Sequence, residues 1–170
     1  MTKELTLQDM YVEHLKDMYS AENQITKALP KIIKTVTSSE LKRALEKHLK
    51  ETEDQIARIE QVFQSLDASP RGKKCAGMEG LLEEGKEAMA EEYASPDLLD
   101  SSLIGGCQKV EHYEICGYKD LIHMAELLGD NKAVDLLTRS LQEEEAADQK
   151  LAALGENMIT SESVHAGQAM

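Results

Sequence analysis

Apolar residues recur every three or four positions along most of the chain, which is the spacing of one face of an α-helix. The sequence shows no alternation of polar and apolar residues of the kind that marks a half-buried strand. The pattern therefore predicts an all-α protein. Its expected helices cover residues 6–36, 40–66, 75–93, 96–128 and 131–158.

Short signals mark where these helices begin and end. Thr6 can cap the first helix, and Asp9 adds a negative charge to its first turn. Ser95 followed by Pro96 is a start signal for the fourth segment, and Gly129 is a typical residue after a helix C-terminus. These signals agree with the apolar spacing, so both criteria predict the same boundaries.

Proline and glycine interrupt two of the helical segments. Pro30 removes a backbone hydrogen bond and is expected to kink the first helix or to end its regular part. The glycine pair 105–106 and Gly117 lie inside the fourth segment, and each glycine costs about 1 kcal/mol relative to alanine. Close approach of two helices, or a local bend, would explain them.

The lengths of the connections predict how the helices are joined. Short breaks at residues 37–39 and 129–130 give two antiparallel hairpins. A longer connection carries the short helix and joins the hairpins, and one long crossover is the ferritin-like connectivity. We therefore expect a ferritin-like four-helix bundle with an extra short helix in the long crossover. Residues 1–160 would form this single domain, and residues 161–170 a flexible polar tail.

Charge and cysteine content narrow the partners and the compartment. The chain has 170 residues and a formal charge of −13, and so acidic a surface disfavours nucleic acid and membranes as partners. The first residues contain no apolar signal segment, and no apolar run reaches the roughly 18 residues of a membrane span. Cys75, Cys107 and Cys116 form no CxxC motif, so we expect reduced thiols and a cytoplasmic protein.

Each long helix carries an acidic residue where its apolar stripe predicts a hydrophobic one. Residues three or four apart share a helix face, so carboxylates on four helices can converge at one level of a bundle. Spacing supports this convergence, since Glu22 and Glu51 are 29 residues apart and Glu114 and Glu144 are 30 apart. The acidic residues on or beside the stripes are Glu22, Glu51, Glu111, Glu114, Glu144 and Asp148.

Carboxylates that face a core must form ion pairs, hold protons or bind a cation, because burying an unpaired charge is costly. Arg58, Lys109 and Lys119 are predicted to point outward, so they would not neutralise the carboxylates. The sequence thus predicts one or two divalent cations inside the bundle. A solvated bundle end, or protons shared between carboxyl groups, is the alternative.

Four segments of the chain carry a resemblance to a known family. They are HLKETEDQIARIEQVF at residues 48–63, CAGMEGLLEE at 75–84, KVEHYEICGY at 109–118 and LQEEEAADQKL at 141–151. Together they resemble the YciF/YciE family of bacterial stress-associated proteins, within the ferritin-like superfamily. The resemblance spans roughly residues 5–160. It implies a four-helix bundle with an added helix, a cytoplasmic location and a homodimer, and it defines the fold better than the activity.

The di-iron proteins of this superfamily imply a set of ligands. They place a Glu on one helix of each hairpin and a Glu-x-x-His motif on the other. Glu114 resembles an additional Glu of rubrerythrin-like proteins. Asp54 stands where the first motif has its His, and Ala147, followed by Asp148, stands where the second has it. The metal ligands implied are Glu22, Glu51, Asp54, Glu111, Glu114, Glu144 and Asp148.

Both expected histidines are absent, and their absence changes which metal ions the ligand set suits. Imidazole ligands suit iron, whereas an all-carboxylate set suits harder ions such as Mn²⁺, Mg²⁺ or Ca²⁺. The expected cofactor is two Fe or Mn ions, with another divalent cation or none as alternatives. His48 lies three residues before Glu51 and could replace a missing ligand or form a hydrogen bond. The residues expected to support the ligands by hydrogen bonds are His48, Tyr19, Tyr118 and Gln55.

These features favour two functions of different kinds. One is a metal-binding stress protein which, as an enzyme, would be a di-metal oxidoreductase of ferroxidase or peroxidase type. The other is a non-catalytic structural or scaffold stress protein, dimeric, with a degenerate metal site. Inward carboxylates on all four long helices favour some metal, and the missing histidines favour the scaffold over catalysis. A storage cage ranks last because nothing in the sequence indicates one.

Overall fold

The computed structural model describes residues 4–159, which form five α-helices and no strand. The all-α prediction is confirmed, and the last two helices begin and end at the predicted residues. The predicted tail at residues 161–170 lies outside the described part of the chain. The helices are α1 Leu7–Thr35, α2 Ser39–Ser65, α3 Ala76–Ala90, α4 Pro96–Leu128 and α5 Asn131–Met158.

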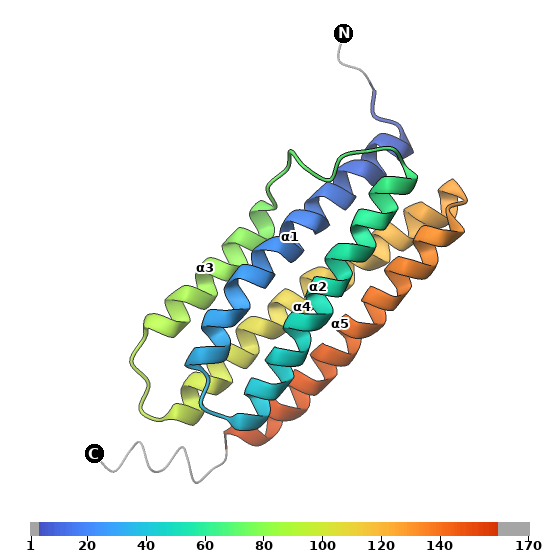
Figure 1. The fold of residues 1–170 in the computed structure, drawn as a ribbon. Helices are drawn as coiled ribbons and strands as arrows, with labels where there is room; N and C mark the ends of the chain where they lie inside the picture. The colour runs from blue at the N-terminus through green and yellow to red at the C-terminus, as the bar shows by residue number, and fades with distance from the viewer. Residues whose placement is uncertain (1–3, 160–170) are drawn as a thin grey trace.

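Four of the helices, α1, α2, α4 and α5, form a bundle, and α3 lies outside it along α1 and α4 (Figure 1). The consecutive helices α1 and α2 pack together, as do α4 and α5, and α2–α5 and α1–α4 contacts join the two hairpins. The long connection from α2 to α4 contains α3. This is the predicted ferritin-like bundle with an added helix in its crossover. Within residues 4–159, no helix has the long apolar stretch needed to cross a membrane.

Local hydrogen bonds cap the helices at the ends that the sequence signals predict. Thr6 Oγ1 accepts from Asp9 N at 3.1 Å, and Asp9 Oδ2 accepts from Thr6 N at 3.0 Å, which completes a capping box. Ser95 Oγ accepts from Leu98 N at the start of α4. Gly129 has a φ of 74°, and from this left-handed conformation its N–H donates to the last turn of α4.

Helix α1 continues past Pro30 to Thr35, so an end of the helix at the proline is excluded. Ile32 and Ile33, which follow the proline, are both buried. Burial of each such side chain stabilises the fold by about 1.5–3 kcal/mol, and an interior proline costs about 3 kcal/mol. Packing of this last turn therefore offsets the lost hydrogen bond.

The internal glycines of α4 have different surroundings. A Cβ at Gly117 would lie 2.1 Å from Cε of Met18, so this glycine leaves space for the end of the Met18 side chain where α1 packs on α4. At Gly105 and Gly106, an added Cβ would meet no atom within 4 Å. Close helix packing therefore explains Gly117 but not the pair at 105–106.

A buried aspartate fastens the α1–α2 loop to the start of α4. Asp100 accepts hydrogen bonds from Thr37 N at 2.9 Å, Thr37 Oγ1 at 2.8 Å and Ser38 N at 2.6 Å. These bonds satisfy backbone donors that lie outside both helices. Sequence periodicity gives no sign of this contact, because it joins residues 63 positions apart.

Candidate metal centre

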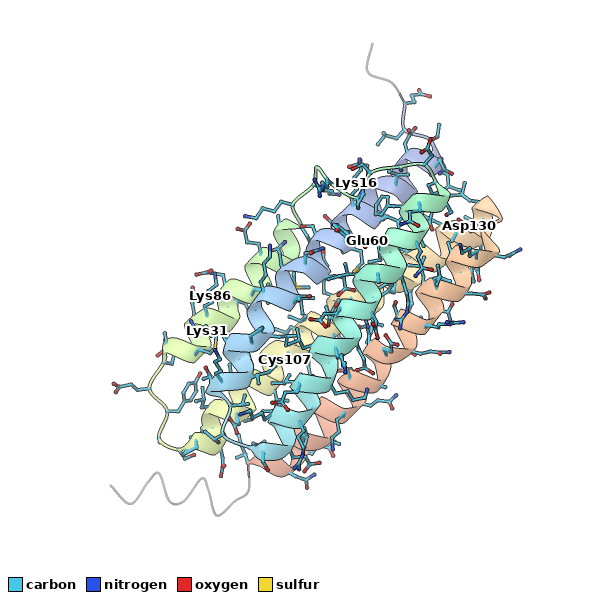
Figure 2. The ribbon with its side chains drawn as sticks, viewed as in Figure 1. Lys16, Lys31, Glu60, Lys86, Cys107 and Asp130 are labelled. Carbon is cyan, nitrogen blue, oxygen red and sulfur yellow. The ribbon has the colours of Figure 1, made fainter. Side chains whose placement is uncertain are left out.

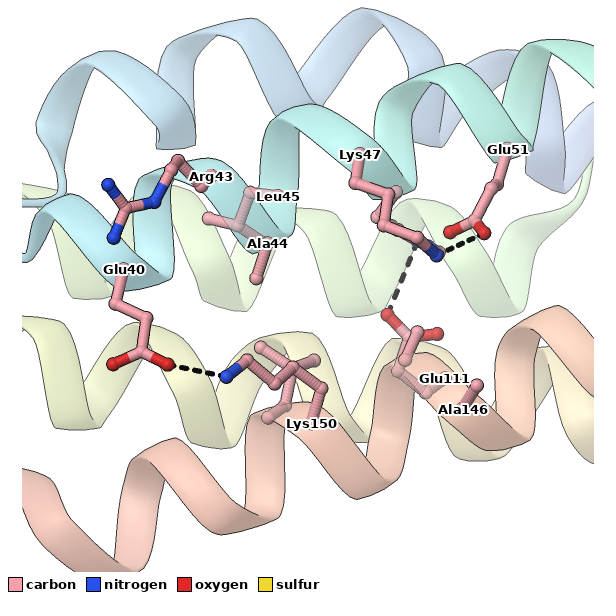
Figure 3. A pocket seen from close by; sticks show the side chains of 12 residues that line it. Glu40, Arg43, Ala44, Leu45, Lys47, Glu51, Glu111, Ala146 and Lys150 are labelled. Carbon is pink, nitrogen blue, oxygen red and sulfur yellow. Dashed lines mark hydrogen bonds and ion pairs between the residues drawn. The ribbon is translucent and has the colours of Figure 1, made fainter.

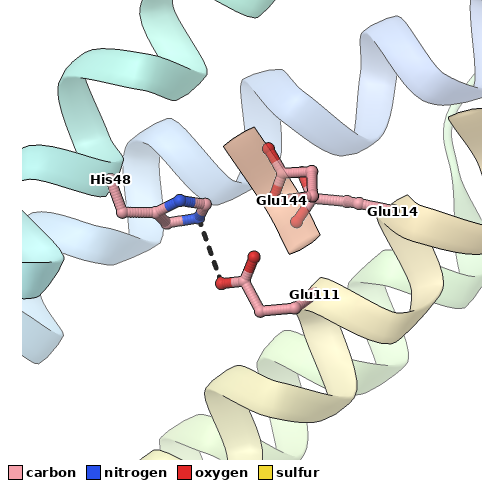
Figure 4. A group of neighbouring side chains, drawn as sticks. All are labelled: His48, Glu111, Glu114 and Glu144. Carbon is pink, nitrogen blue, oxygen red and sulfur yellow. Dashed lines mark ion pairs between the residues drawn. The ribbon is translucent and has the colours of Figure 1, made fainter. Parts of the chain in front are cut away.

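Buried polar side chains gather near the midpoints of the four long helices. Helix α2 contributes His48, α4 contributes Glu111 and Glu114, and α5 contributes Glu144. One ligand atom from each of these buried residues lies within 4.8 Å of the others (Figure 4). We refer to these four residues as the carboxylate–histidine cluster.

Apolar neighbours on the same helix face hold the acidic side chains inward. In α4, Val110 and Tyr118 lie four residues before and after Glu114, and all three are buried. In α5, Glu144 lies seven residues before the buried Leu151. Burial of the apolar residues orients each helix, so the carboxylates face the core although water would solvate them better.

Glu22 brings α1 to the same centre. It is fully buried, and the Tyr118 hydroxyl of α4 donates a hydrogen bond to its Oε1. The negative charge of Glu22 contributes to raising the pKa of both Glu111 and Glu114. The structure thus brings four of the predicted ligands together: Glu22, Glu111, Glu114 and Glu144.

Several polar atoms of this centre have no hydrogen-bond partner among the described residues. His48 Nε2 lies 3.3 Å from Glu111 Oε1, an ion-pair distance without the geometry of a hydrogen bond. Within residues 4–159, no lysine or arginine forms an ion pair with the cluster or with Glu22. Buried carboxylates without counter-charges have the chemistry of a cation site. The unpartnered atoms are Glu22 Oε2, Glu111 Oε2, Glu144 Oε2, both carboxylate oxygens of Glu114 and both ring nitrogens of His48.

Burial favours the protonated form of these carboxyl groups. It raises the pKa of Glu22 to about 8, and the negative charge of Glu144 adds to the effect. It also raises the pKa of Glu111 and Glu114 well above the ordinary range of a carboxyl group, again with a contribution from Glu144. A cation that binds here therefore displaces protons, and its affinity increases with pH.

A chain of polar side chains supports Glu144 from α2. Gln55 Nε2 donates to Glu144 Oε1 and, at 3.1 Å, to Glu143 Oε2. Arg58 donates to both carboxylate oxygens of Glu143, at 2.6 and 2.7 Å, and to Ser140 Oγ at 3.1 Å. The prediction that Arg58 points outward is wrong, because its long side chain reaches α5 and pairs with Glu143. The spacing of apolar residues in the sequence does not show that a long side chain extends to a neighbouring helix.

Two predicted ligands of α2 lie outside the cluster. His48 and Thr52 are on the buried face of α2, whereas Glu51 lies at its edge and pairs with Lys47. Asp54 is exposed. The comparison with di-iron proteins placed a ligand at Glu51 and another at Asp54, but neither side chain lies on the buried face of α2. His48 is the residue of this helix that faces the cluster.

Asp148 and Tyr19 lie beside the centre rather than in it. Asp148 Oδ1 accepts a hydrogen bond from Gln108 at 3.0 Å. Tyr19 Oη donates to Glu60 Oε1 at 2.9 Å rather than to a carboxylate of the cluster. Tyr19 is three residues before Glu22, and Asp148 is four residues after Glu144. Because neither spacing is a whole number of helical turns, each side chain lies at the edge of the buried face.

Two cavities reach the cluster from different sides of the bundle. The first, of about 450 Å³, lies between α2 and α5, and Lys47 and Glu51 are among its charged lining residues (Figure 3). The second, of about 370 Å³, lies between α1, α3 and α4. His48 and Glu111 line both cavities. Both cavities therefore border the cluster at these two residues.

By its fold, this protein belongs to the class of ferritin-like helical bundles, and its core contains carboxylates and an imidazole. The domain of unknown function DUF892 matches residues 6–164, and the chain belongs to this family. Protein YciF of Escherichia coli strain K12 is 42% identical over 159 residues, which cover 93% of this chain and 95% of YciF. The resemblance found in the sequence is thereby confirmed.

Solved structures of related proteins have the same fold. The E. coli stress protein YciF matches with a TM-score of 0.87 at 42% identity, over 91% of this chain and 98% of YciF. YcfI from Rhodopseudomonas palustris, described as a structural protein, matches with a TM-score of 0.83 at 43% identity, over 87% and 94% of the two chains. A Xanthomonas campestris protein at 20% identity, with a TM-score of 0.72 over 95% of each chain, supports the fold alone. The chain is thus a homologue of a stress protein.

Proposed function

We propose that this chain is a cytoplasmic stress-response protein that binds two divalent metal ions in the core of its bundle. The observation that supports this most strongly is the set of seven unpartnered polar atoms on five buried residues. A cation would neutralise the carboxylates and occupy these atoms together. The stress role is carried over from YciF.

The donor set fits iron or manganese. His48 offers an imidazole, and Glu111, Glu114 and Glu144 offer carboxylates within 4.8 Å of it and of one another. Glu22 adjoins these groups and would take part in holding a second ion. A mixed imidazole and carboxylate set suits Fe²⁺ and Mn²⁺. His48 would thus supply one of the two imidazoles that the Glu-x-x-His positions lack.

The chain's own contribution is to hold the ligands and to control their protons. Tyr118 orients Glu22, and Gln55 orients Glu144, by donating hydrogen bonds. Burial keeps the carboxyl groups protonated until a cation displaces the protons. A redox-active ion held here would supply the electron transfer of a ferroxidase or peroxidase.

A second candidate is a non-catalytic structural stress protein, a homodimer in which the metal site is degenerate. The R. palustris relative, at 43% identity, is described as a structural protein. Glu51 and Asp54 lie outside the cluster, so α2 contributes only the His48 imidazole where the ferritin-like pattern has a Glu-x-x-His pair. In this case the cluster would be the remnant of a metal site, and protons on its carboxyl groups would take the place of the metal ion.

Metal content distinguishes the two candidates. The protein is purified without chelator, incubated with Fe²⁺ or Mn²⁺ and analysed by elemental mass spectrometry, beside the variants Glu114→Gln and Glu51→Gln. We expect about two ions per chain in the wild type, as in di-iron bundles. Glu51→Gln should retain them, because Glu51 lies outside the cluster, and Glu114→Gln should lose them.

A wild-type chain that retains neither ion contradicts the metal proposal and favours the structural candidate. If metal is retained, oxidation of Fe²⁺ and consumption of hydrogen peroxide are measured on the loaded protein. Turnover that Glu114→Gln lacks would establish an oxidoreductase. Equal rates in the wild type and in this variant would limit the function to metal binding.

A further inference from the structure

The cavity between α1, α3 and α4 has apolar walls along most of its length. Its volume of about 370 Å³ lies within the range of small-molecule sites. We refer to it as the apolar cavity. Apolar residues of all three helices line it, including Ile25, Leu29, Leu82, Met89, Leu103 and Val110.

Glycines keep this cavity open. Gly85 of α3 and the pair Gly105 and Gly106 of α4 line it, and a Cβ at any of them would meet no atom within 4 Å. A glycine inside a helix is less favourable than alanine, and no close packing requires these three glycines. Their common effect is to leave space between α3 and α4.

Buried, unpartnered polar atoms lie at the inner end of the apolar cavity. His48 and Glu111 line it, with 4% and 1% of their surface exposed. Both ring nitrogens of His48 and Oε2 of Glu111 lack hydrogen-bond partners among the described residues. The cavity is therefore an apolar passage that ends at polar atoms with free bonding capacity.

Lysines gather at the outer end, although the chain carries a formal charge of −13. Lys27 and Lys31 of α1, Lys86 of α3 and Lys109 of α4 line the cavity, and Figure 2 shows Lys31 and Lys86 on neighbouring helices. Lys86 and Lys109 pair with glutamates of α3. Within residues 4–159, Lys27 and Lys31 form no ion pair. The rim therefore suits an anionic group.

We propose that the apolar cavity binds a medium-chain aliphatic carboxylate. Its hydrocarbon chain lies between α3 and α4, where the glycines leave space. Its carboxylate lies at Lys27 and Lys31, and its hydrocarbon chain ends among the apolar lining residues, which leaves the polar atoms of His48 and Glu111 to a cation or water. Apolar walls supply affinity by burying the chain, and the lysine rim selects an anionic head group over a cationic one. This binding does not depend on a metal in the cluster.

Calorimetric titration with decanoate, below its micelle concentration, tests the proposal on the full-length chain in the presence of a chelator. We expect saturable binding at a single site. Gly106→Leu fills part of the cavity and should weaken binding by about tenfold or more, as expected for the loss of a few buried methylenes. Gly80→Leu is the matched control, because Gly80 has open space around it but does not line the cavity.

The head group is tested separately. Lys27→Gln/Lys31→Gln should weaken decanoate binding by about threefold to tenfold, because solvent-exposed charge pairs contribute only modestly to binding. Decyltrimethylammonium, which has the same chain and a cationic head, should bind more weakly than decanoate to the wild type. Gly85→Leu, on the α3 wall, replaces Gly106→Leu if circular dichroism shows that the latter does not fold.

Three results would overturn the proposal. They are an absence of saturable decanoate binding, equal affinities of the wild type and the cavity-filling variant, and equal affinities of the two amphiphiles. Because the titration is made without metal, a failure here is distinct from a failure of the chain to retain Fe or Mn.

Discussion

Glu22, Glu111 and Glu114 are carboxyl groups whose protonated form is favoured by burial in the folded chain. In the unfolded chain they titrate near the ordinary value for glutamic acid, about 4.3. Between that value and the raised pKa, the folded chain binds more protons than the unfolded chain. The free energy of unfolding therefore decreases as pH increases through this window, which for Glu22 extends to a pKa of about 8.

We expect the metal-free protein to be less stable at pH 8 than at pH 5.5. Each of the three groups can lower the free energy of unfolding by up to about 1.4 kcal/mol per pH unit within its window. Urea denaturation in the presence of a chelator measures the decrease. Glu114→Gln removes one titrating group and should make the decrease less steep. Stability that increases with pH, or an unchanged slope in the variant, would show that these groups do not hold the protons.

At the scale of the element, a hydrogen-bonded chain holds the start of α3 to the bundle. Cys75 precedes α3, and its Sγ lies 2.9 Å from Tyr113 Oη of α4, which donates to Asp17 Oδ2 of α1 at 2.9 Å. A Cβ at Gly77 would lie 2.8 Å from the Tyr113 ring. Because the hydroxyl is held on two sides, the ring cannot move away freely, and Gly77 allows α3 to approach it.

Gly77→Ala should therefore destabilise the protein although alanine is the better helix former. The overlap with the ring is expected to cost about 1–3 kcal/mol, against a propensity gain of about 1 kcal/mol. Gly80→Ala, in the same helix with open space around it, should instead stabilise the protein by up to about 1 kcal/mol. Urea denaturation of both variants measures the difference. Equal stabilisation by the two alanines would contradict the close contact.

Asp100→Ala should loosen the junction between the first hairpin and α4. It removes the acceptor for the loop donors of Thr37 and Ser38 and is expected to cost about 3 kcal/mol. Asp97→Ala, in the exposed first turn of the same helix, should cost only the interaction with the helix dipole, about 0.5 kcal/mol. Similar losses in the two variants, measured by urea denaturation, would refute the role of Asp100.

At the scale of the whole molecule, the polar centre joins the two hairpins. The first hairpin supplies Glu22 and His48, and the second supplies Glu111, Glu114 and Glu144. Without a cation, the two hairpins pack together only with protons on these carboxyl groups, because charged carboxylates would repel one another. A bound cation would connect the hairpins and would therefore act on global unfolding rather than on one loop.

We expect Mn²⁺ to raise the melting temperature of the chelator-treated protein. At a free concentration one hundred times the Kd, binding stabilises by about 2.7 kcal/mol, which for a domain of this size corresponds to roughly 5–10 °C. Differential scanning calorimetry at constant ionic strength measures the shift, beside His48→Ala/Glu144→Gln, in which it should be absent. The same shift in both proteins would mean that Mn²⁺ acts on the acidic surface.

Features of the chain with a local physical cause could be predicted from the sequence. The apolar repeat and the caps at Thr6 and Ser95 depend on residues within one turn, so the helix bounds were predictable to within a few residues. Glu114 and Glu144 were recognisable because each interrupts an apolar stripe on its own helix. Arg58 and Asp100 were not, because their partners are on other helices.

The apolar repeat, the caps and the connection lengths were sufficient to predict the five helices, their connectivity into two hairpins and a crossover, and the acidic residues on the inner faces. The sequence pattern did not predict that His48, and not Glu51, faces the cluster, or that Gly105 and Gly106 border a cavity. Successive residues are about 100° apart around a helix, so a broad apolar stripe leaves the rotation of the helix uncertain by about one residue. Packing against neighbouring helices sets that rotation, and with it the side chains that meet at the centre.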